Sequence, residues 1–462
     1  MKSLPLFLAS LVAGTFLGLA ETAAPTMEQR VDAVVAREMA AKGFIGLSVA
    51  VMNHGQLAVC KGYGKRDLAS AALVDTNTIF AIGSVSKQFT CVAILLLAED
   101  GRLSVEDKVA QYYPKLTSAD DIRLIDLMRH VSGYTDYYPL DFVDSRMQKT
   151  IAPDDLIQQY AGGTLDFPPR SNYSYSNTGY IILGRIVEKI SGLSLGEFLQ
   201  RRIFGPLGMQ HTVYEPRETG SGFATGYRSF ALGDPEPTAS EGLGWLGGAG
   251  AIRSTAGDLA KWDLALAEGT LLKPASWKLM TSPFTLKDGR NSEYGCGVSV
   301  SQRNGYTTVN HTGAVSGFMA GNALIPSTRS AVVVLSNCEQ PLGDLRAQLF
   351  GLLTTQTSHV PDVAGKPATE VAQEVFFQFQ TGKLDRSQLG AEFSQFVTDE
   401  KLRMASQKLK PLGKVVSAKL GDRNERGGME VTTVRLEFKK GSCGILMYRL
   451  PKGEIEEFLI LP

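Results

Sequence analysis

The chain has no excess of charge of either sign. It contains 47 Lys and Arg residues against 47 Asp and Glu residues, so its formal net charge at pH 7 is zero. No basic run stands out in the sequence. Proteins that bind nucleic acid rely on clustered positive charge to contact phosphates. The composition therefore gives no support to a nucleic-acid-binding function, and we expect no nucleic-acid partner.

Cysteine and histidine are both scarce, with five residues of each among 462. The five cysteines are odd in number and no two lie close in sequence, so neither a disulfide framework nor a zinc site is indicated, although one or two isolated bridges are compatible with an oxidising compartment. No histidine forms an H-x-H or H-E-x-x-H pattern, which argues against a metallohydrolase. We expect no metal ion and no organic cofactor.

Long apolar runs are also rare, and the clearest one is N-terminal. The segment from Leu4 to Ala20 is mostly apolar, follows the single early charge of Lys2, and ends in the small-residue sequence Gly18-Leu19-Ala20. This pattern is typical of a cleaved export signal, whereas a membrane span needs about 20 apolar residues. We predict that residues 1–20 are a signal peptide and that the protein is exported, either periplasmic or secreted, with no stable membrane span after cleavage.

The periodic patterns predict an α+β fold. With 44% hydrophobic residues the chain can form large cores in two or three units. Strand patterns at both ends of a first region enclose a series of helical patterns. We expect the strands to meet in one antiparallel sheet flanked by helices, with the intervening helices in a separate lobe and a ligand site between the two. The expected strands are 46–52, 56–64, 306–310, 317–325 and 330–336, and the expected helices are 27–42, 85–100, 122–130, 178–190 and 255–267.

The end of the chain predicts a second, smaller unit. Residues 354–367 are rich in Ser, Thr, Pro and Gly without periodicity and are interpreted as a linker. Residues 368–410 have helical patterns, and 415–461 alternate like a strand meander. The predicted organisation is a first domain over 21–353, the linker over 354–367, and a small α+β domain over 368–462 to which the sequence assigns no role.

The stretch Ser84-Val85-Ser86-Lys87 is the most informative part of the chain. Residues three apart share one face of a helix, so the Lys87 amine can reach the Ser84 hydroxyl if a helix begins near Ser84. A neighbouring base is one way to activate a serine hydroxyl, which is a weak nucleophile at its free pKa. The S-x-x-K pattern is found in β-lactamases and penicillin-binding proteins, but it is weak evidence by itself.

Two further unique motifs follow in the order that such enzymes require. Tyr175-Ser176-Asn177 is the only Y-x-N sequence, and His311-Thr312-Gly313 is the only match to [K/H]-[T/S]-G. Together with Ser84-Val85-Ser86-Lys87, they resemble the serine β-lactamase and penicillin-recognising family, most closely its class C and D,D-peptidase branch. The resemblance covers about Met27 to Cys338. Three shorter phrases agree with it: 130–133 (HVSG), 177–180 (NTGY) and 250–255 (GAIRST).

The resemblance implies a role for each motif residue. Ser84 would be the nucleophile that becomes acylated, and the backbone N–H groups of Ser84 and Ala314 would form an oxyanion hole. Asn177 would position Lys87 and the substrate amide. Lys87 and Tyr175 are both candidate bases with an ordinary pKa near 10. Because two such groups side by side can share one proton, the sequence does not choose between them.

The third motif departs from the pattern of many β-lactamases, which have lysine where this chain has His311. A lysine would offer a permanent cation to a substrate carboxylate, whereas histidine, with an ordinary pKa near 6.5, offers one only conditionally. Thr312 can still donate a hydrogen bond from its hydroxyl, and Gly313 completes the motif. A buried histidine satisfied by the core is the alternative interpretation. The departure favours a peptidase, esterase or amidase over a β-lactamase.

The expected function is that of a serine hydrolase that forms an acyl-enzyme on a peptide or amide bond, with D,D-carboxypeptidase-like activity as one form. The substrate would be a small molecule or peptide with a carbonyl, with or without a neighbouring carboxylate. An esterase or a β-lactamase using the same site is one alternative. A penicillin-binding receptor that is acylated without turnover is another. Neither the leaving group nor the oligomeric state follows from the sequence.

Overall fold

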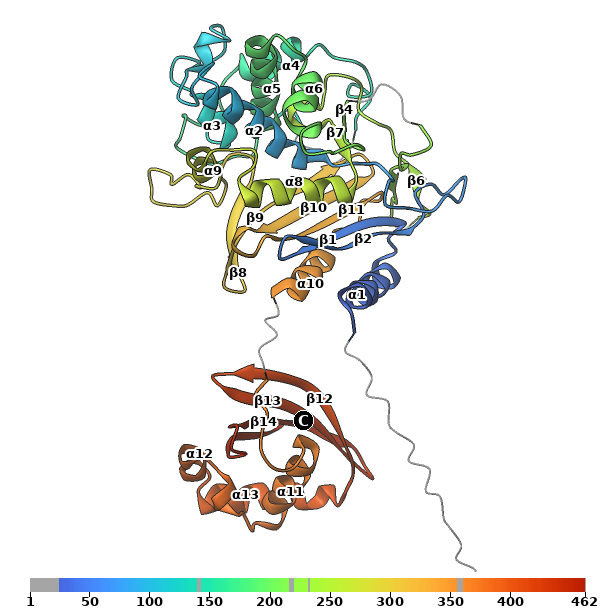
Figure 1. Ribbon diagram of the computed structural model, residues 1–462, viewed down its shortest axis with the longest axis vertical. Helices are drawn as coiled ribbons and strands as arrows, with labels where there is room; N and C mark the ends of the chain where they lie inside the picture. Colours follow the sequence, from blue (N-terminus) through green and yellow to red (C-terminus); the bar gives the residue numbers. More distant parts are fainter. Residues whose placement is uncertain (1–24, 139–142, 216–219, 232, 355–359, 462) are drawn as a thin grey trace, which may run out of the picture. The chain divides into compact units, whose positions relative to one another are not determined.

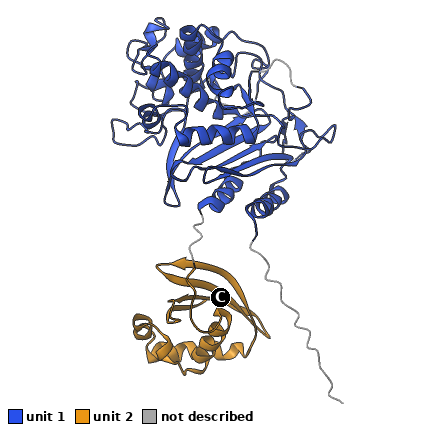
Figure 2. Cartoon of the chain, in the orientation of Figure 1, with its two compact units in different colours: residues 1–354 blue, residues 355–462 orange. Residues whose placement is uncertain are grey.

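The computed structural model describes residues 25–138, 143–215, 220–231, 233–354 and 360–461. The chain divides between Thr354 and Thr355 into two compact units (Figure 2). The predicted signal peptide, residues 1–20, lies outside the described residues. Within the described ranges, no helix combines the length and apolar character needed to cross a membrane. All five cysteines are unpaired.

The first unit is built on a six-stranded antiparallel sheet with the strand order β2-β1-β11-β10-β9-β8 (Figure 1). Its first two strands come from the start of the chain and the other four come from about 250 residues later, so the predicted union of distant strands is confirmed. The register pairs Val49 with Val334. The strands are β1 (Gly46–Asn53), β2 (Gln56–Gly64), β8 (Ser299–Arg303), β9 (Tyr306–Val315), β10 (Phe318–Ile325) and β11 (Ser330–Ser336).

Helices cover both faces of this sheet. Helix α8 (Ala256–Glu268) lies on one face, whereas α1 (Met27–Lys42) and α10 (Gly343–Thr354) lie on the other (Figure 1). Alternate residues of β11 point to the two sides: Val332 and Val334 pack toward α1 and α10, and Val333 and Leu335 pack into the larger core. A strand buried on both faces reads as a continuous apolar run, which explains the sequence Ala331 to Leu335.

A helical lobe is inserted between β2 and β8. Its central helix is α2 (Ser86–Glu99), in which every residue from Ser86 to Leu97 is buried. A short 3₁₀ turn, η1 (Gly83–Val85), precedes it. The other helices of this lobe are α3 (Leu124–Met128), α4 (Pro153–Ala161), α5 (Asn177–Ser191), α6 (Leu195–Leu199), α7 (Gly247–Gly250) and α9 (Pro274–Met280); short strands are β3 (Phe80–Ala81), β4 (Val213–Tyr214), β5 (Tyr227–Arg228), β6 (Glu236–Pro237) and β7 (Ile252–Ser254).

The structure differs from the predicted elements at one place that matters for function. The sequence pattern ends a strand at Asn310, but β9 continues to Val315. The extension is held by pairing with β10, in which His311 lies opposite Asn322 and Val315 opposite Phe318. Polar and small residues hid this pairing from a pattern based on alternating apolar residues. The whole third motif therefore lies within a strand instead of a loop.

The second unit is a four-stranded antiparallel sheet with the order β12-β13-β14-β15, packed against helices. The predicted meander is present, with its turns at Gly427-Gly428 and Lys452-Gly453. Part of the segment interpreted as a linker belongs to this unit, because the Lys366 carbonyl accepts a hydrogen bond from Arg449 at 2.9 Å. The elements are α11 (Ala368–Thr381), α12 (Ala391–Phe396), α13 (Asp399–Leu409), β12 (Val415–Arg426), β13 (Met429–Phe438), β14 (Ser442–Arg449) and β15 (Ile455–Leu461).

Candidate active site

Ser84 lies in the 3₁₀ turn η1, one turn before Lys87 in helix α2. The Lys87 Nζ atom lies 3.1 Å from the Ser84 Oγ atom, so the two side chains are within hydrogen-bond reach as the spacing predicts. Gly83, beside Ser84, has a φ of +49°, and a Cβ there would lie 2.9 Å from the Ala314 nitrogen. Both its backbone conformation and its close approach to β9 thus require glycine at this position.

Lys87 is fully buried and surrounded by acceptors. Its Nζ atom donates to the Asn177 Oδ1 atom at 2.7 Å and to the Ala249 carbonyl at 2.8 Å. Burial lowers the pKa of the Lys87 amine to about 7, and the negative charge of Asp136 opposes part of this effect. At neutral pH a large fraction of Lys87 is therefore a neutral amine that can accept a proton.

Tyr175 lies beside this pair, with its ring centroid 4.9 Å from the Lys87 Nζ atom. Its hydroxyl is buried and has no hydrogen-bond partner at normal distance within the described part of the chain. Burial raises the pKa of the Tyr175 phenol well above its usual value, and the nearby Ser84 hydroxyl offsets part of that rise. The phenol is therefore protonated in the free protein. Of the two candidate bases that the sequence left open, the structure favours Lys87.

His311 does not offer the cation that the sequence analysis considered. Its side chain is 5% exposed, and its Nδ1 and Nε2 atoms lie 2.5 Å from the Thr312 carbonyl and 2.8 Å from the Tyr294 hydroxyl. Since a carbonyl only accepts, Nδ1 carries the proton and Nε2 accepts from Tyr294. Burial lowers the pKa of His311 to about 3, with the Lys87 charge adding to the effect. His311 is thus buried and neutral, as in the alternative interpretation of a core histidine, and its part in substrate binding stays a prediction.

The rest of the third motif faces the site through the alternation of β9. Thr312 and Ala314 are exposed, whereas His311 and Gly313 are buried. A Cβ on Gly313 would lie 3.1 Å from the Ser84 nitrogen and 2.0 Å from the Ile82 carbonyl oxygen. Because Gly313 has no side chain, β9 can pack directly against η1. The Ser84 nitrogen in η1 and the Ala314 nitrogen in β9 therefore belong to two segments in contact.

This close approach makes Gly313→Ala a sensitive change. The added methyl group cannot be accommodated without moving β9 away from η1, because the atom in its way is backbone. We expect a loss of kcat/KM of about 100-fold or more, the size that follows a displacement of about 1 Å at a reacting centre. Steady-state kinetics and thermal melts of both variants measure the effect. Gly163→Ala is the control, because a Cβ on Gly163 meets no atom within 4 Å. Unchanged acylation in Gly313→Ala would contradict this account.

Asp136 is a site residue that the motifs did not identify. One carboxylate oxygen, Oδ1, accepts from the Asn177 backbone nitrogen at 3.0 Å and from its Nδ2 atom at 3.1 Å, and Oδ2 is 3.2 Å from the same Nδ2 atom. The carboxamide of Asn177 therefore binds Lys87 through its oxygen and Asp136 through its nitrogen. Of the two contacts expected for Asn177, the structure shows the one with Lys87, and the contact with a substrate amide stays a prediction. Asp136 follows His130-Val131-Ser132-Gly133 by three residues, and this proximity was the one available signal.

A layer of aromatic and imidazole rings supports Tyr175 from behind. The His130 ring centroid lies 4.2 Å from that of Tyr175, and its Nδ1 atom accepts from the Ser176 backbone nitrogen at 3.0 Å. His130 therefore packs against Tyr175 and fixes the backbone beside it. Tyr294, which the sequence analysis missed, contacts both His130 and Tyr175 through its ring. Only tertiary packing reveals it, because Tyr294 has no motif around it.

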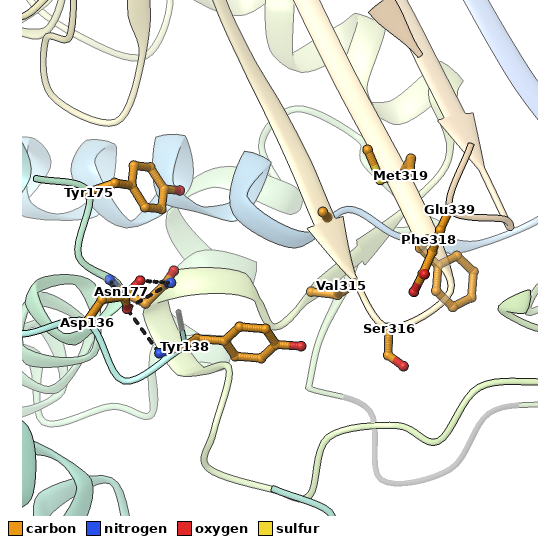
Figure 3. A pocket seen from close by; sticks show the side chains of 10 residues that line it. Asp136, Tyr138, Tyr175, Asn177, Val315, Ser316, Phe318, Met319 and Glu339 are labelled. Carbon is orange, nitrogen blue, oxygen red and sulfur yellow. Dashed lines mark hydrogen bonds between the residues drawn. The ribbon is translucent and has the colours of Figure 1, made fainter. Parts of the chain in front are cut away.

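A cavity of about 410 Å³ opens beside these residues (Figure 3). Asp136, Tyr175 and Asn177 line one end, and Ser316 and Glu339 line the other. Within the described ranges, no three His, Cys, Asp or Glu side chains are arranged to hold a metal ion. The remaining lining residues are Tyr138, Ala314, Val315, Phe318 and Met319.

Comparison with known proteins identifies the family. The family model described as Beta-lactamase matches residues 31–353. Penicillin-binding protein 4* of Bacillus subtilis (strain 168) is 30% identical over 309 residues, which cover 63% of this chain and 68% of that protein. A D-aminopeptidase of Gluconobacter oxydans (strain 621H) is 27% identical over 296 residues, covering 63% and 55%.

A solved structure gives the same fold. The D-amino acid amidase from Ochrobactrum anthropi SV3, crystallised with D-phenylalanine, superposes with a TM-score of 0.63 at 21% identity, over 70% of this chain and 98% of that one. The fold of this chain and the order of its three motifs agree with the family model, which matches most of the chain. The chain therefore belongs to the beta-lactamase family and is a serine hydrolase of that family.

Proposed function

We propose that the protein hydrolyses an amide or peptide bond of a D-aminoacyl substrate through an acyl-enzyme at Ser84, with Lys87 as the base. The observation that carries this proposal is the environment of Lys87. A neutral amine has two N–H bonds and one lone pair. In the structure the Nζ atom donates to the Asn177 Oδ1 atom, the Ala249 carbonyl and the Ser84 Oγ atom. When Lys87 is neutral, the first two contacts use its N–H bonds, so its lone pair is the group that faces the Ser84 hydroxyl at 3.1 Å.

The reaction follows from these positions. The Ser84 Oγ atom attacks the substrate carbonyl carbon while its proton passes to Lys87, and the carbonyl oxygen becomes an oxyanion facing the N–H groups of Ser84 and Ala314. The C–N bond then breaks, and the leaving nitrogen takes a proton from the Lys87 ammonium, directly or through the Tyr175 hydroxyl. Water, deprotonated by the restored Lys87 amine, hydrolyses the ester and regenerates Ser84.

The charges around the cavity bear on the substrate. Its described lining includes the carboxylates of Asp136 and Glu339 and no Lys, Arg or His side chain. A substrate carboxylate next to the scissile bond therefore meets no cation in this lining, which favours a substrate with a free amine or a neutral end. The name of the related D-aminopeptidase supports the same choice and the D configuration.

D,D-carboxypeptidase activity is the second candidate, and Arg253 is the observation that favours it. Its guanidinium lies 5.8 Å from the Phe318 ring, and it lines a small recess that shares Val315, Ser316 and Phe318 with the main cavity. Burial lowers the pKa of Arg253, while the negative charge of Glu241 opposes this change. A cation at this place could receive the carboxylate of a longer peptide that reaches beyond Ser316.

A panel of substrates tests the proposal. The values of kcat/KM are compared for five substrates: D-alanine p-nitroanilide, its N-acetyl derivative, the L-alanine analogue, an acyl-D-Ala-D-Ala peptide and a chromogenic cephalosporin. We expect the free D-amide to be cleaved at least about tenfold faster than its L-isomer, the size of discrimination that one well-placed pocket contact supplies. Intact mass spectrometry should show a transient acyl adduct.

The other outcomes separate the alternatives. Preferred cleavage of the D-Ala-D-Ala peptide would establish the carboxypeptidase instead, and rapid cephalosporin turnover would establish a β-lactamase. An adduct that persists for hours without turnover of any substrate would contradict hydrolysis and indicate a penicillin-binding receptor.

Export remains part of the proposal. It rests on the residue pattern of 1–20, which is typical of a cleaved signal peptide. N-terminal sequencing of the protein recovered from culture medium or periplasm would give a chain beginning near Glu21 if the signal is cleaved where the sequence predicts.

A further inference from the structure

The carboxylate of Asp136 and the amine of Lys87 contact opposite ends of one carboxamide. The Asn177 Nδ2 atom donates to Asp136 at 3.1 and 3.2 Å, and the Asn177 Oδ1 atom accepts from Lys87 at 2.7 Å. Figure 3 shows Asp136 and Asn177 in contact at one end of the cavity. The three side chains form a hydrogen-bonded chain that leads from a loop residue to the candidate base.

A carboxylate can only accept hydrogen bonds, so it dictates which way the carboxamide faces. With Asp136 ionised, the NH₂ group of Asn177 must turn toward it, and the carbonyl oxygen must turn toward Lys87. In the opposite orientation, the NH₂ group would face the Lys87 amine and compete with the Ser84 hydroxyl for its lone pair. The orientation of Asn177 therefore determines where that lone pair points.

We propose that Asp136 is a positioning residue, which holds the Asn177 carbonyl toward Lys87 and so keeps the Lys87 lone pair directed at Ser84. This inference rests on the proposed function, in which Lys87 is the base. Asp136 itself contacts neither Ser84 nor Lys87 through a hydrogen bond in the described structure; it acts through Asn177.

Asp136 also accepts from the backbone N–H of Asn177, the first residue of α5. The N-cap residue Ser176 makes no side-chain cap, so Asp136 supplies that acceptor from another segment. Asp136→Ala would remove the cap together with the orienting group. Asp136→Asn keeps a carbonyl oxygen that can accept from the Asn177 backbone N–H. It replaces the carboxylate, which can only accept, by a carboxamide that can also donate. The variant therefore separates capping of α5 from orientation of the Asn177 side chain.

The charge of Asp136 gives this variant a distinctive pH signature. The other titratable groups that face Lys87 from the surrounding elements are Cys91, His130, Tyr175, Tyr180 and His311. Burial and the Lys87 charge lower the pKa of both histidines, and burial raises those of Cys91 and both tyrosines. The negative charge of Asp136 instead raises the pKa of Lys87, so its loss lowers that pKa further.

The experiment measures kcat, KM and the pH dependence of kcat/KM for Asp136→Asn in the full-length chain. We expect kcat to fall about 10- to 100-fold with little change in KM, because the base is misdirected while the substrate contacts remain. The acid limb of the profile should move to lower pH. Asp166→Asn is the matched control, since its carboxylate accepts from Thr135, next to Asp136, at 2.7 Å but does not reach Asn177. The control should keep the wild-type profile.

A paired variant reverses the sign of the shift. Asp136→Asn combined with Asn177→Asp places the obligate acceptor directly against Lys87, so the acid limb should move above that of the wild type. An acid limb in the paired variant at or below the wild-type position would overturn the proposal, even if Asp136→Asn alone does not fold. Wild-type kcat and profile in a folded Asp136→Asn would overturn it as well. Hydrolysis that survives in Ser84→Ala would instead overturn the proposed function.

Discussion

Ser84→Ala is expected to abolish hydrolysis, with a fall in kcat/KM of about 10⁴- to 10⁶-fold, the range seen when a catalytic nucleophile is removed. The alanine leaves the rest of the site in place but provides no oxygen to form the acyl ester. The effect should be on chemistry alone. Ser84 is half-buried in a short turn, and its hydroxyl contacts the Lys87 amine at 3.1 Å, so the melting temperature should change little.

Two measurements check this expectation. The acyl adduct seen by intact mass spectrometry in the wild type should be absent from Ser84→Ala under the same conditions. Ser171 is a half-buried serine in the same lobe, and its hydroxyl donates to the Pro168 carbonyl. Ser171→Ala should form the adduct normally. More than about 1% residual kcat/KM in Ser84→Ala, beyond the level that contamination explains, would place the nucleophile elsewhere.

Lys87→Met is expected to have the second largest effect, a loss of kcat of about 10³-fold or more, because it removes the base while preserving most of the side-chain volume. In the wild type, the acid limb of the pH profile should lie near pH 7, since burial lowers the pKa of Lys87 to about 7. Below that pH, the rate should fall about tenfold per unit as Lys87 becomes protonated. Lys87→Met should show no such limb in its residual activity.

The same substitution should change how folding stability depends on pH. Lys87 has a pKa of about 7 in the folded protein and 10.5 when exposed, so between these values the unfolded chain binds more protons and wild-type stability rises with pH. Lys87→Met lacks this dependence. We expect the free energy of unfolding of the wild type, relative to that of Lys87→Met, to increase by about 2 kcal/mol between pH 7 and pH 9.

Denaturant melts at the two pH values measure this difference. Lys261→Met is the control, because Lys261 is half-exposed and paired with Asp258 at 2.8 Å; its difference from the wild type should not grow between pH 7 and pH 9. A constant difference between the wild type and Lys87→Met over this range would show that Lys87 titrates normally and cannot be neutral at pH 7.

The motifs located the centre of the site because the chemistry needs particular side chains at short spacings. Ser84 and Lys87 are one turn apart in any helix, so their contact follows from local geometry. Tyr175 and Asn177 could be assigned to the same site from their order along the chain. Continuous apolar runs likewise predicted central strands of the β-sheet, since strands buried on both faces leave unbroken runs of Val and Ala.

Charge state was the property that sequence could not supply. Burial lowers the pKa of His311 to about 3 and that of Lys87 to about 7, while it raises that of the Tyr175 phenol, and none of these shifts can be read from residue identity. The second partner of Lys87 is a backbone carbonyl, that of Ala249, which lies 162 residues along the chain and has no motif. Any residue can provide a carbonyl, so no residue pattern could have identified this contact.

Residue identity and local periodicity were enough to predict the candidate reacting groups, the family they indicate and the α+β architecture. The proposal of Lys87 as the base, the buried and neutral state of His311, and the contact of Asp136 with Asn177 all required the tertiary structure. These properties depend on burial and on contacts between distant segments, which arise only when the lobe and the sheet pack together around Lys87.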